Sequence, residues 1–157
     1  MKRKILISLF SLLVILVTAF IFYNSTKGTE ASYKDSDSVT EIVKPMISKD
    51  IAQDKKTLDF IVRKGAHGAE FALLGITVFS LSIILWESFK KPFFGTSLFY
   101  VLAVAVADEY IQSFKNRSNE VLDIVIDFTG GVLGILVTLI VYFVYRFLKK
   151  RIKRPVV

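Results

Sequence analysis

Ten ionisable or strongly polar residues gather in three clusters, each at one end of a long apolar stretch. Carboxylates and a histidine at the margin of a hydrocarbon layer are costly unless they are paired or face water, so they indicate a functional site. The clusters are Arg63, Lys64, His67 and Glu70; then Asp108, Glu109, Gln112 and Arg117; then Asp123 and Asp127.

The first cluster contains His67, the only histidine in the chain. On a helix Lys64, His67 and Glu70 share one face, because they are three residues apart. A histidine beside a carboxylate can transfer protons near neutral pH. An equally weighted reading is structural, with His67 hydrogen-bonded to Glu70 or to a carboxylate of a facing helix.

The second cluster combines carboxylates with an amide. A continuing helix presents Asp108 and Glu109 together with Gln112, which is four and three residues further on. Arg117 follows in a short connection, where its planar guanidinium suits a carboxylate or a phosphate, including a lipid phosphate. The alternative for Arg117 is a salt bridge to Glu120 or Asp123.

The third cluster lies on a stripe of small residues. Asp123 and Asp127 share a helical face with Gly130 and Gly134, so both carboxylates should face a neighbouring helix. Asp127 needs a cationic partner, a shared proton or a metal ion. The sequence requires no cofactor and leaves metal binding open. Candidate catalytic residues are His67, Glu70, Asp108, Glu109, Asp123 and Asp127, and candidate binding residues are Arg63, Lys64, Gln112 and Arg117.

The composition indicates a membrane protein. Of the 157 residues 53% are hydrophobic, and the mean hydropathy is +0.53. Such a chain is too apolar for an ordinary soluble domain of this length. The absence of cysteine excludes disulfides, thiolate zinc sites and cysteine nucleophiles. No phosphate-binding glycine loop, nucleophile elbow or paired-histidine zinc motif is present.

Four apolar windows approach the length of about 20 residues that a helix needs to cross a membrane. They cover 5–23, 66–86, 93–107 and 121–147, and they predict an all-α integral membrane bundle of about four transmembrane helices. The third window is the shortest. The first is interpreted as an uncleaved anchor rather than a signal peptide, because it is long and has no small-residue cleavage site.

The placement of lysine and arginine predicts the orientation. With the amino terminus inside, the cytoplasmic segments contain 11 of the 21 basic residues but only Glu87 of the 14 acidic ones. This bias places both termini in the cytoplasm and all three polar clusters at the outer surface. The net charge of +7 therefore requires no nucleic acid partner.

The predicted organisation has four parts: an anchor helix at 1–23, an extracytoplasmic loop at 24–59, a three-helix membrane domain at 60–148 and a basic cytoplasmic tail at 149–157. The polar stretch 24–37 is typical of a linker. Ser38-Val39-Thr40-Glu41 has capping-box spacing and predicts a short amphipathic helix after it. A simple linker is an equally weighted alternative there.

The three clusters together resemble the VanZ-like family of bacterial membrane proteins, whose founding member is associated with resistance to teicoplanin. The resemblance rests on Arg63, Lys64, His67 and Glu70, on Asp108, Glu109, Gln112 and Arg117, and on Asp123, Asp127 and Gly130. It covers about residues 62–136 and leaves out the first span and its loop. Gly68 stands where the family pattern has an aromatic residue, which predicts looser packing at that position.

The resemblance implies a multi-pass protein of the bacterial cytoplasmic membrane that lowers susceptibility to teicoplanin or lipoglycopeptides. It would do so by binding or altering a lipid-linked cell-wall component, or the glycopeptide target, in the outer leaflet. Two alternatives stay open: a membrane enzyme that acts on a lipid-linked substrate, and a structural or partner-binding membrane protein. The resemblance supplies no catalytic assignment, and the oligomeric state stays open.

Overall fold

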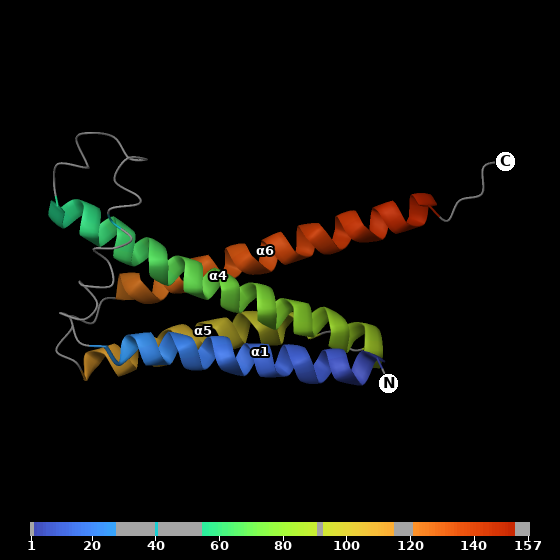
Figure 1. The fold of residues 1–157 in the computed structure, drawn as a ribbon, viewed down its shortest axis with the longest axis horizontal. Helices are drawn as coiled ribbons and strands as arrows, with labels where there is room; N and C mark the ends of the chain where they lie inside the picture. Colours follow the sequence, from blue (N-terminus) through green and yellow to red (C-terminus); the bar gives the residue numbers. More distant parts are fainter. Residues whose placement is uncertain (1, 28–39, 41–54, 91–92, 115–120, 153–157) are drawn as a thin grey trace.

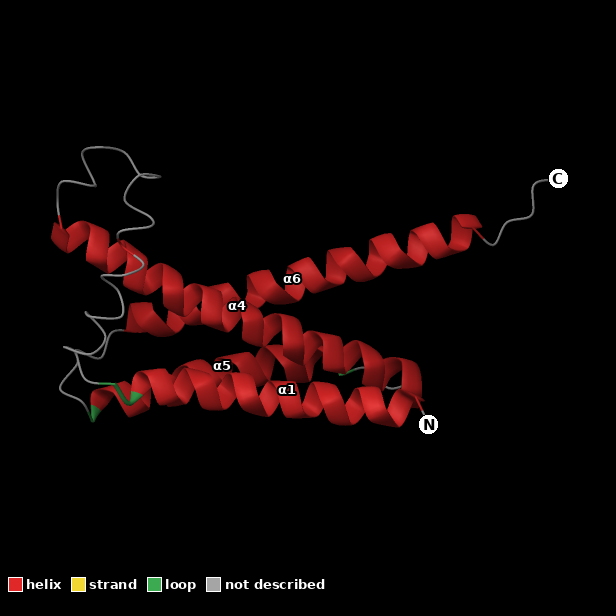
Figure 2. Cartoon of the chain, viewed as in Figure 1, coloured by secondary structure: helices red, strands yellow, loops and turns green. Residues whose placement is uncertain are grey.

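A computed structural model describes residues 2–27, 40, 55–90, 93–114 and 121–152 of the chain. Its helices are α1 (Lys2–Ser25), α4 (Lys55–Phe89), α5 (Phe94–Ser113) and α6 (Val121–Ile152). No strand occurs within these described ranges (Figure 2). The predicted all-α bundle is therefore confirmed, whereas the predicted amphipathic helix lies outside the described residues except for Thr40.

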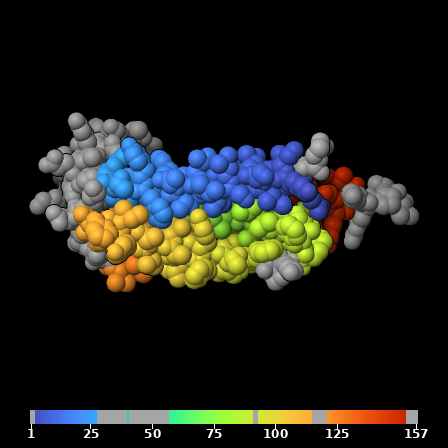
Figure 3. Space-filling model, turned by 90° about the horizontal axis from the view of Figure 1, so that it is seen from below, coloured from blue at the N-terminus to red at the C-terminus, as the bar shows by residue number. Residues whose placement is uncertain are grey.

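The four helices run alternately up and down. The first turn of α1 and the last turn of α6 lie at the same end of the bundle, and α4 crosses α6 at an angle near its middle (Figure 1). Seen from the perpendicular direction, α1 and α5 lie side by side along the length of the molecule (Figure 3). This alternation brings the end of α1, the start of α4, the end of α5 and the start of α6 together.

The outward surface of the helices is apolar. All four helices are long and apolar enough to cross a membrane. Large hydrophobic side chains such as Ile15 and Leu16 on α1 and Ile140 and Phe143 on α6 are more than half exposed. Exposed apolar surface of this extent suits hydrocarbon rather than water. The chain is therefore a multi-pass membrane protein.

The crossing of α4 and α6 depends on small residues. A Cβ atom added to Gly75, Gly130 or Gly134 would collide with a backbone carbonyl oxygen of the facing helix, belonging to Gly131, Gly68 and Ala72 respectively. Without side chains the two backbones come into direct contact, as in other small-residue crossings in membranes. The packing of Gly68 against Gly130 is thus close, although a side chain at Gly68 would itself meet open space.

An apolar core and two hydroxyl pairs complete the bundle. The core includes Phe71 and Leu74 of α4 and Val101 of α5, all fully buried. The Ser82 and Ser97 hydroxyls are 2.5 Å apart and link α4 to α5. Thr18 and Tyr100 hydroxyls are 3.1 Å apart and link α1 to α5. Such hydrogen bonds join helices where no hydrophobic effect operates between them.

The helices extend beyond the predicted windows. α1 includes Asn24 and Ser25, which the sequence placed in a linker, and α4 begins at Lys55 instead of near residue 60. α5 continues through its polar residues to Ser113, and α6 continues through the basic cluster to Ile152. Polar residues are tolerated at these ends because partners on neighbouring helices or one turn earlier accept their hydrogen bonds, as for Lys149 and the Tyr145 hydroxyl at 3.3 Å.

Replacing Gly134 by valine tests the crossing. The added side chain meets the Ala72 carbonyl, so we expect Gly134→Val to lower the free energy of unfolding by about 1–3 kcal/mol, the range for overpacked sites. The measurement is thermal or denaturant unfolding of the purified protein in detergent. Gly65→Val is the matched control, because a Cβ at Gly65 meets no atom within 4 Å. Equal destabilisation by both substitutions would contradict the close crossing.

Candidate functional site

The three polar clusters lie at one end of the bundle. Asp108, Glu109 and Gln112 occupy the last turns of α5, and Asp123 and Asp127 occupy the first turns of α6 (Figure 1). Lys64, His67 and Glu70 lie in the half of α4 that reaches the same end. Residues separated by up to 63 positions in the sequence, such as Lys64 and Asp127, are therefore close in space.

Asp108 is at the centre of this site and is fully buried. The Ser25 hydroxyl donates a hydrogen bond to its Oδ1 atom, and the Gln112 amide donates one to its Oδ2 atom at 2.7 Å. Asp108 and Gln112 are four residues apart, so the helical spacing itself aligns them. Gln112 thereby positions the carboxylate, and the last turn of α1 takes part in the site through Ser25.

Three helices bring potential metal ligands together around Asp108. One ligand atom from each of His67, Asp108 and Asp127 lies within 4.8 Å of the others. Asp127 is 3% exposed, and His67 is half-buried. Bonds to zinc are about 2.0–2.2 Å long and tetrahedral, so two ligand atoms of one ion are about 3.4 Å apart. A small side-chain rotation would therefore let these three residues share a divalent cation.

The electrostatic surroundings of Asp127 are strongly acidic. Asp108, Glu109 and Asp123 all lie within electrostatic range of the Asp127 carboxylate, and Lys64 acts on it with opposite charge. Asp108, Glu109 and Asp127 are each buried. Burying several like charges close together is unfavourable unless a cation or a proton reduces the charge. The site thus favours binding of a cation, or a proton shared between its carboxylates.

Lys64 of α4 forms an ion pair with Asp123 of α6. The two side chains are only 15% and 19% exposed, so the pair is shielded from most of the solvent. The Lys64 ammonium also lies 5.4 Å from the centre of the Phe60 ring, on the same face of α4. This pair joins the same two helices that the glycines bring together. The positive charge of Lys64 is therefore largely neutralised by Asp123 and is less available to an external anion.

The sequence did not predict the contribution of α1. The Asn24 amide donates a hydrogen bond of 2.8 Å to Glu70 Oε1, in addition to the Ser25 bond to Asp108. The other carboxylate oxygen of Glu70 is buried and accepts no hydrogen bond from the described residues. The available signal was a pair of hydrogen-bonding side chains directly after an apolar run, because such side chains often join membrane helices.

The structure gives less information on two of the predicted binding residues, Arg63 and Arg117. Arg63 lies on α4, half-buried, one position before the lysine of the ion pair. Arg117 lies outside the described residues, as does Glu120, its predicted partner. The structure thus brings together eight predicted residues from three helices, together with Asn24 and Ser25. The eight are Lys64, His67, Glu70, Asp108, Glu109, Gln112, Asp123 and Asp127.

Alternating helices that can cross a membrane, with polar side chains collected at one end, define a polytopic α-helical membrane protein. A family model described as VanZ/LLP1 matches residues 10–143, and the chain belongs to this family. The resemblance of the polar clusters is thereby confirmed, and the association with teicoplanin resistance holds at the level of the family. The match covers residues 10–25 of α1 and the loop sequence after it, so the expectation that the first span and its loop lie outside it is wrong. Comparison with curated proteins gave no match, and comparison with solved structures gave none.

Proposed function

We propose that this protein lowers susceptibility to teicoplanin or lipoglycopeptides by binding or altering an anionic lipid-linked component in the outer leaflet. The observation that carries the proposal is the junction at Asp108, where side chains from all four helices gather around a buried carboxylate. Intramembrane ionisable groups are expensive and mark functional sites by default. The glycine crossing already packs α4 against α6, so packing alone does not explain these charges.

The two ends of the bundle differ in charge, which supports an outward-facing site. The end opposite the polar site carries Arg3 and Lys4 of α1 together with Arg146, Lys149, Lys150 and Arg151 of α6. Among the described residues Glu87 is the acidic one near that end, and its backbone oxygen accepts a hydrogen bond from Arg3 at 3.2 Å. The positive end belongs in the cytoplasm by the positive-inside rule. The polar site then faces the surface where glycopeptides act.

An acidic site can bind an anionic lipid only through cations. Arg63 lies at its margin on the first half of α4, next to Lys64, which is already paired with Asp123. A divalent ion held by buried carboxylates could also bridge to a phosphate oxygen, as metal ions do in phosphate sites. Either route places the phosphate of a lipid-linked component beside His67, which can exchange a proton with a neighbouring group.

Susceptibility testing of a gene-deletion strain tests this function. We expect deletion to increase susceptibility to teicoplanin or a lipoglycopeptide, and the intact gene to restore the original level. Asp127→Asn should leave the strain as susceptible as the deletion, because it removes a charge from the centre of the site. Glu87→Gln is the matched control: it neutralises a carboxylate at the opposite end and should restore fully. The proposal fails if deletion leaves the inhibitory concentrations of these antibiotics unchanged.

A second candidate function is a metal-dependent membrane enzyme that acts on a lipid-linked substrate. The close approach of His67, Asp108 and Asp127 favours it, because one nitrogen and two oxygen ligands suit zinc or manganese. Three protein ligands leave coordination positions for water or a phosphate oxygen. In this reading Glu70 or Glu109 would serve as an acid or base near the bound substrate.

Metal analysis of the purified protein distinguishes the second candidate from simple lipid binding. After equilibration with Zn²⁺ or Mn²⁺ and removal of free ions, we expect about one ion per chain, since the three ligand atoms can share a single ion. His67→Ala should abolish retention, and Glu87→Gln should not alter it. A protein that retains neither ion, while still lowering antibiotic susceptibility in cells, would exclude metal dependence and leave lipid binding in place.

A further inference from the structure

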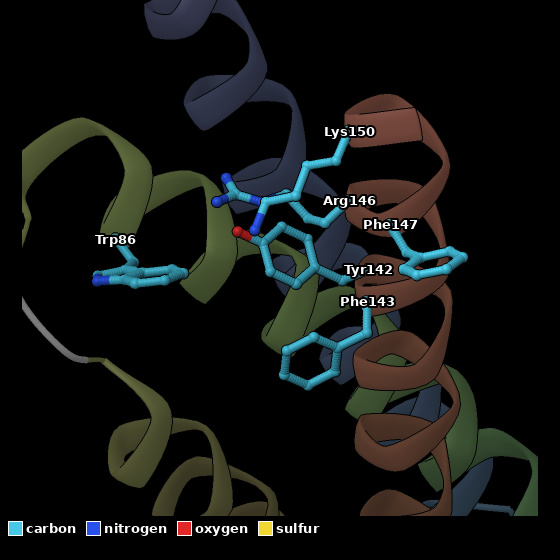
Figure 4. Close-up of a pocket in the computed structure, with 6 residues that line it drawn as sticks. All are labelled: Trp86, Tyr142, Phe143, Arg146, Phe147 and Lys150. Atoms are coloured by element: carbon cyan, nitrogen blue, oxygen red, sulfur yellow. The ribbon is translucent and has the colours of Figure 1, made fainter. Parts of the chain in front are cut away.

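A second polar site lies at the opposite end of the bundle from Asp108. There a pocket opens between the last turns of α4 and the second half of α6 (Figure 4). Two cationic side chains and four aromatic rings line it, and none of these lining residues is acidic. They are Trp86, Tyr142, Phe143, Arg146, Phe147 and Lys150.

The polar groups of this pocket converge. Tyr142, Arg146 and Lys150 follow one another at four-residue intervals on one stripe of α6, and their side chains extend from the same side of this helix (Figure 4). The Arg146 guanidinium lies 5.8 Å from the centre of the Tyr142 ring. The Tyr142 hydroxyl is buried and makes no hydrogen bond with the residues that the structure describes. Three hydrogen-bond donors, two cationic and one neutral, thus lie on the same side of α6 in this pocket.

The arrangement of the two cations indicates an anion. Like charges one helical turn apart repel each other, and exposed lysine and arginine side chains are free to turn apart in solvent. Here both turn toward the buried Tyr142 hydroxyl instead (Figure 4). A phosphate oxygen could accept hydrogen bonds from all three groups, since each can donate one. The geometry therefore matches a bound phosphate.

The position along α6 and the surrounding rings indicate that the phosphate belongs to a lipid. An α-helix rises about 1.5 Å per residue, so Arg146 lies about 29 Å from Asp127 along the axis of α6. The hydrocarbon core of a bilayer is about 30 Å thick. The pocket is thus at headgroup level in the leaflet opposite the Asp108 site. Phe143 is 62% exposed and lies about one turn closer to the middle of the membrane than the cations, where an acyl chain would run.

We propose that this pocket binds the phosphate of an anionic phospholipid, with its acyl chain lying against Phe143. The Trp86 ring forms the α4 wall, held 6.4 Å from the Tyr142 ring in an edge-on arrangement. Basic pockets between membrane helices recognise anionic headgroups through this combination of charge and hydrogen bonding. The site is separate from the proposed outer site.

Trp86 is the only tryptophan in the chain, so its fluorescence reports on the pocket. The full-length protein in a neutral detergent is titrated with phosphatidylglycerol that carries brominated acyl chains, which quench tryptophan on contact. We expect saturable quenching by this lipid and much weaker quenching by brominated phosphatidylcholine. The double variant Arg146→Gln with Lys150→Gln should shift the midpoint roughly 30-fold, because it removes two hydrogen bonds to the phosphate.

A charge-matched control separates a defined pocket from a diffuse basic surface. Lys149→Gln with Arg151→Gln removes the same charge from the same turns, but neither residue lines the pocket. This control should shift the midpoint much less than the pocket variant. Tyr142→Phe, which removes only the buried hydroxyl, should weaken binding several-fold. Circular dichroism and gel filtration establish that each variant is folded.

Three outcomes would overturn the proposal. Equal shifts for the two double variants would mean that the basic end attracts lipid without a specific site. Equal quenching by phosphatidylcholine would mean that the pocket accepts acyl chains without recognising an anionic headgroup. Displacement of the brominated lipid by inorganic phosphate alone would mean that the site binds free phosphate rather than a phospholipid.

Discussion

The close contact between α4 and α6 determines the geometry of the rest of the molecule. Gly130 packs against the Gly68 carbonyl. Gly68 directly follows His67 on α4, and Gly130 comes three residues after Asp127 on α6. This contact is what places an imidazole of one helix beside a carboxylate of the other. Side chains at these glycines would separate the backbones, and the distance between His67 and Asp127 would increase. The geometry of the polar site therefore depends on the close packing of the two helices at the crossing.

The second constraint is the burial of charge near a membrane surface. Asp108 is fully enclosed, and the neutral side chains of Ser25 and Gln112 donate hydrogen bonds to it. The Lys64–Asp123 pair compensates charge at the margin, while Asp108 and Asp127 lie deeper. The charge of such a cluster has to be compensated by a cation or a proton. We infer that a cation bound there is what contacts an anionic lipid-linked component.

Much of the architecture could be predicted from the sequence. Apolar windows indicated the helices, and helical spacing placed Asp108 with Gln112 and Asp123 with Asp127 on shared faces. The role of Asn24 and Ser25 could not be predicted, because locally they resemble the polar linker that follows them. Their partners, Glu70 and Asp108, are far away in the sequence and adjacent only in the folded bundle. Helix ends were similarly underestimated, since several partners of the terminal polar residues lie on neighbouring helices.

The central claim is that all four helices contribute side chains to one functional site. A substitution in α1 tests this claim most directly. Ser25→Ala removes the hydrogen bond to Asp108, and Thr26→Ala removes a hydroxyl that bonds only within the last turn of α1. Each variant is expressed in the deletion strain at equal membrane levels, and the inhibitory concentration of teicoplanin is measured. The account predicts that Ser25→Ala increases susceptibility toward that of the deletion, whereas Thr26→Ala behaves as the original protein. Full resistance with Ser25→Ala would contradict it.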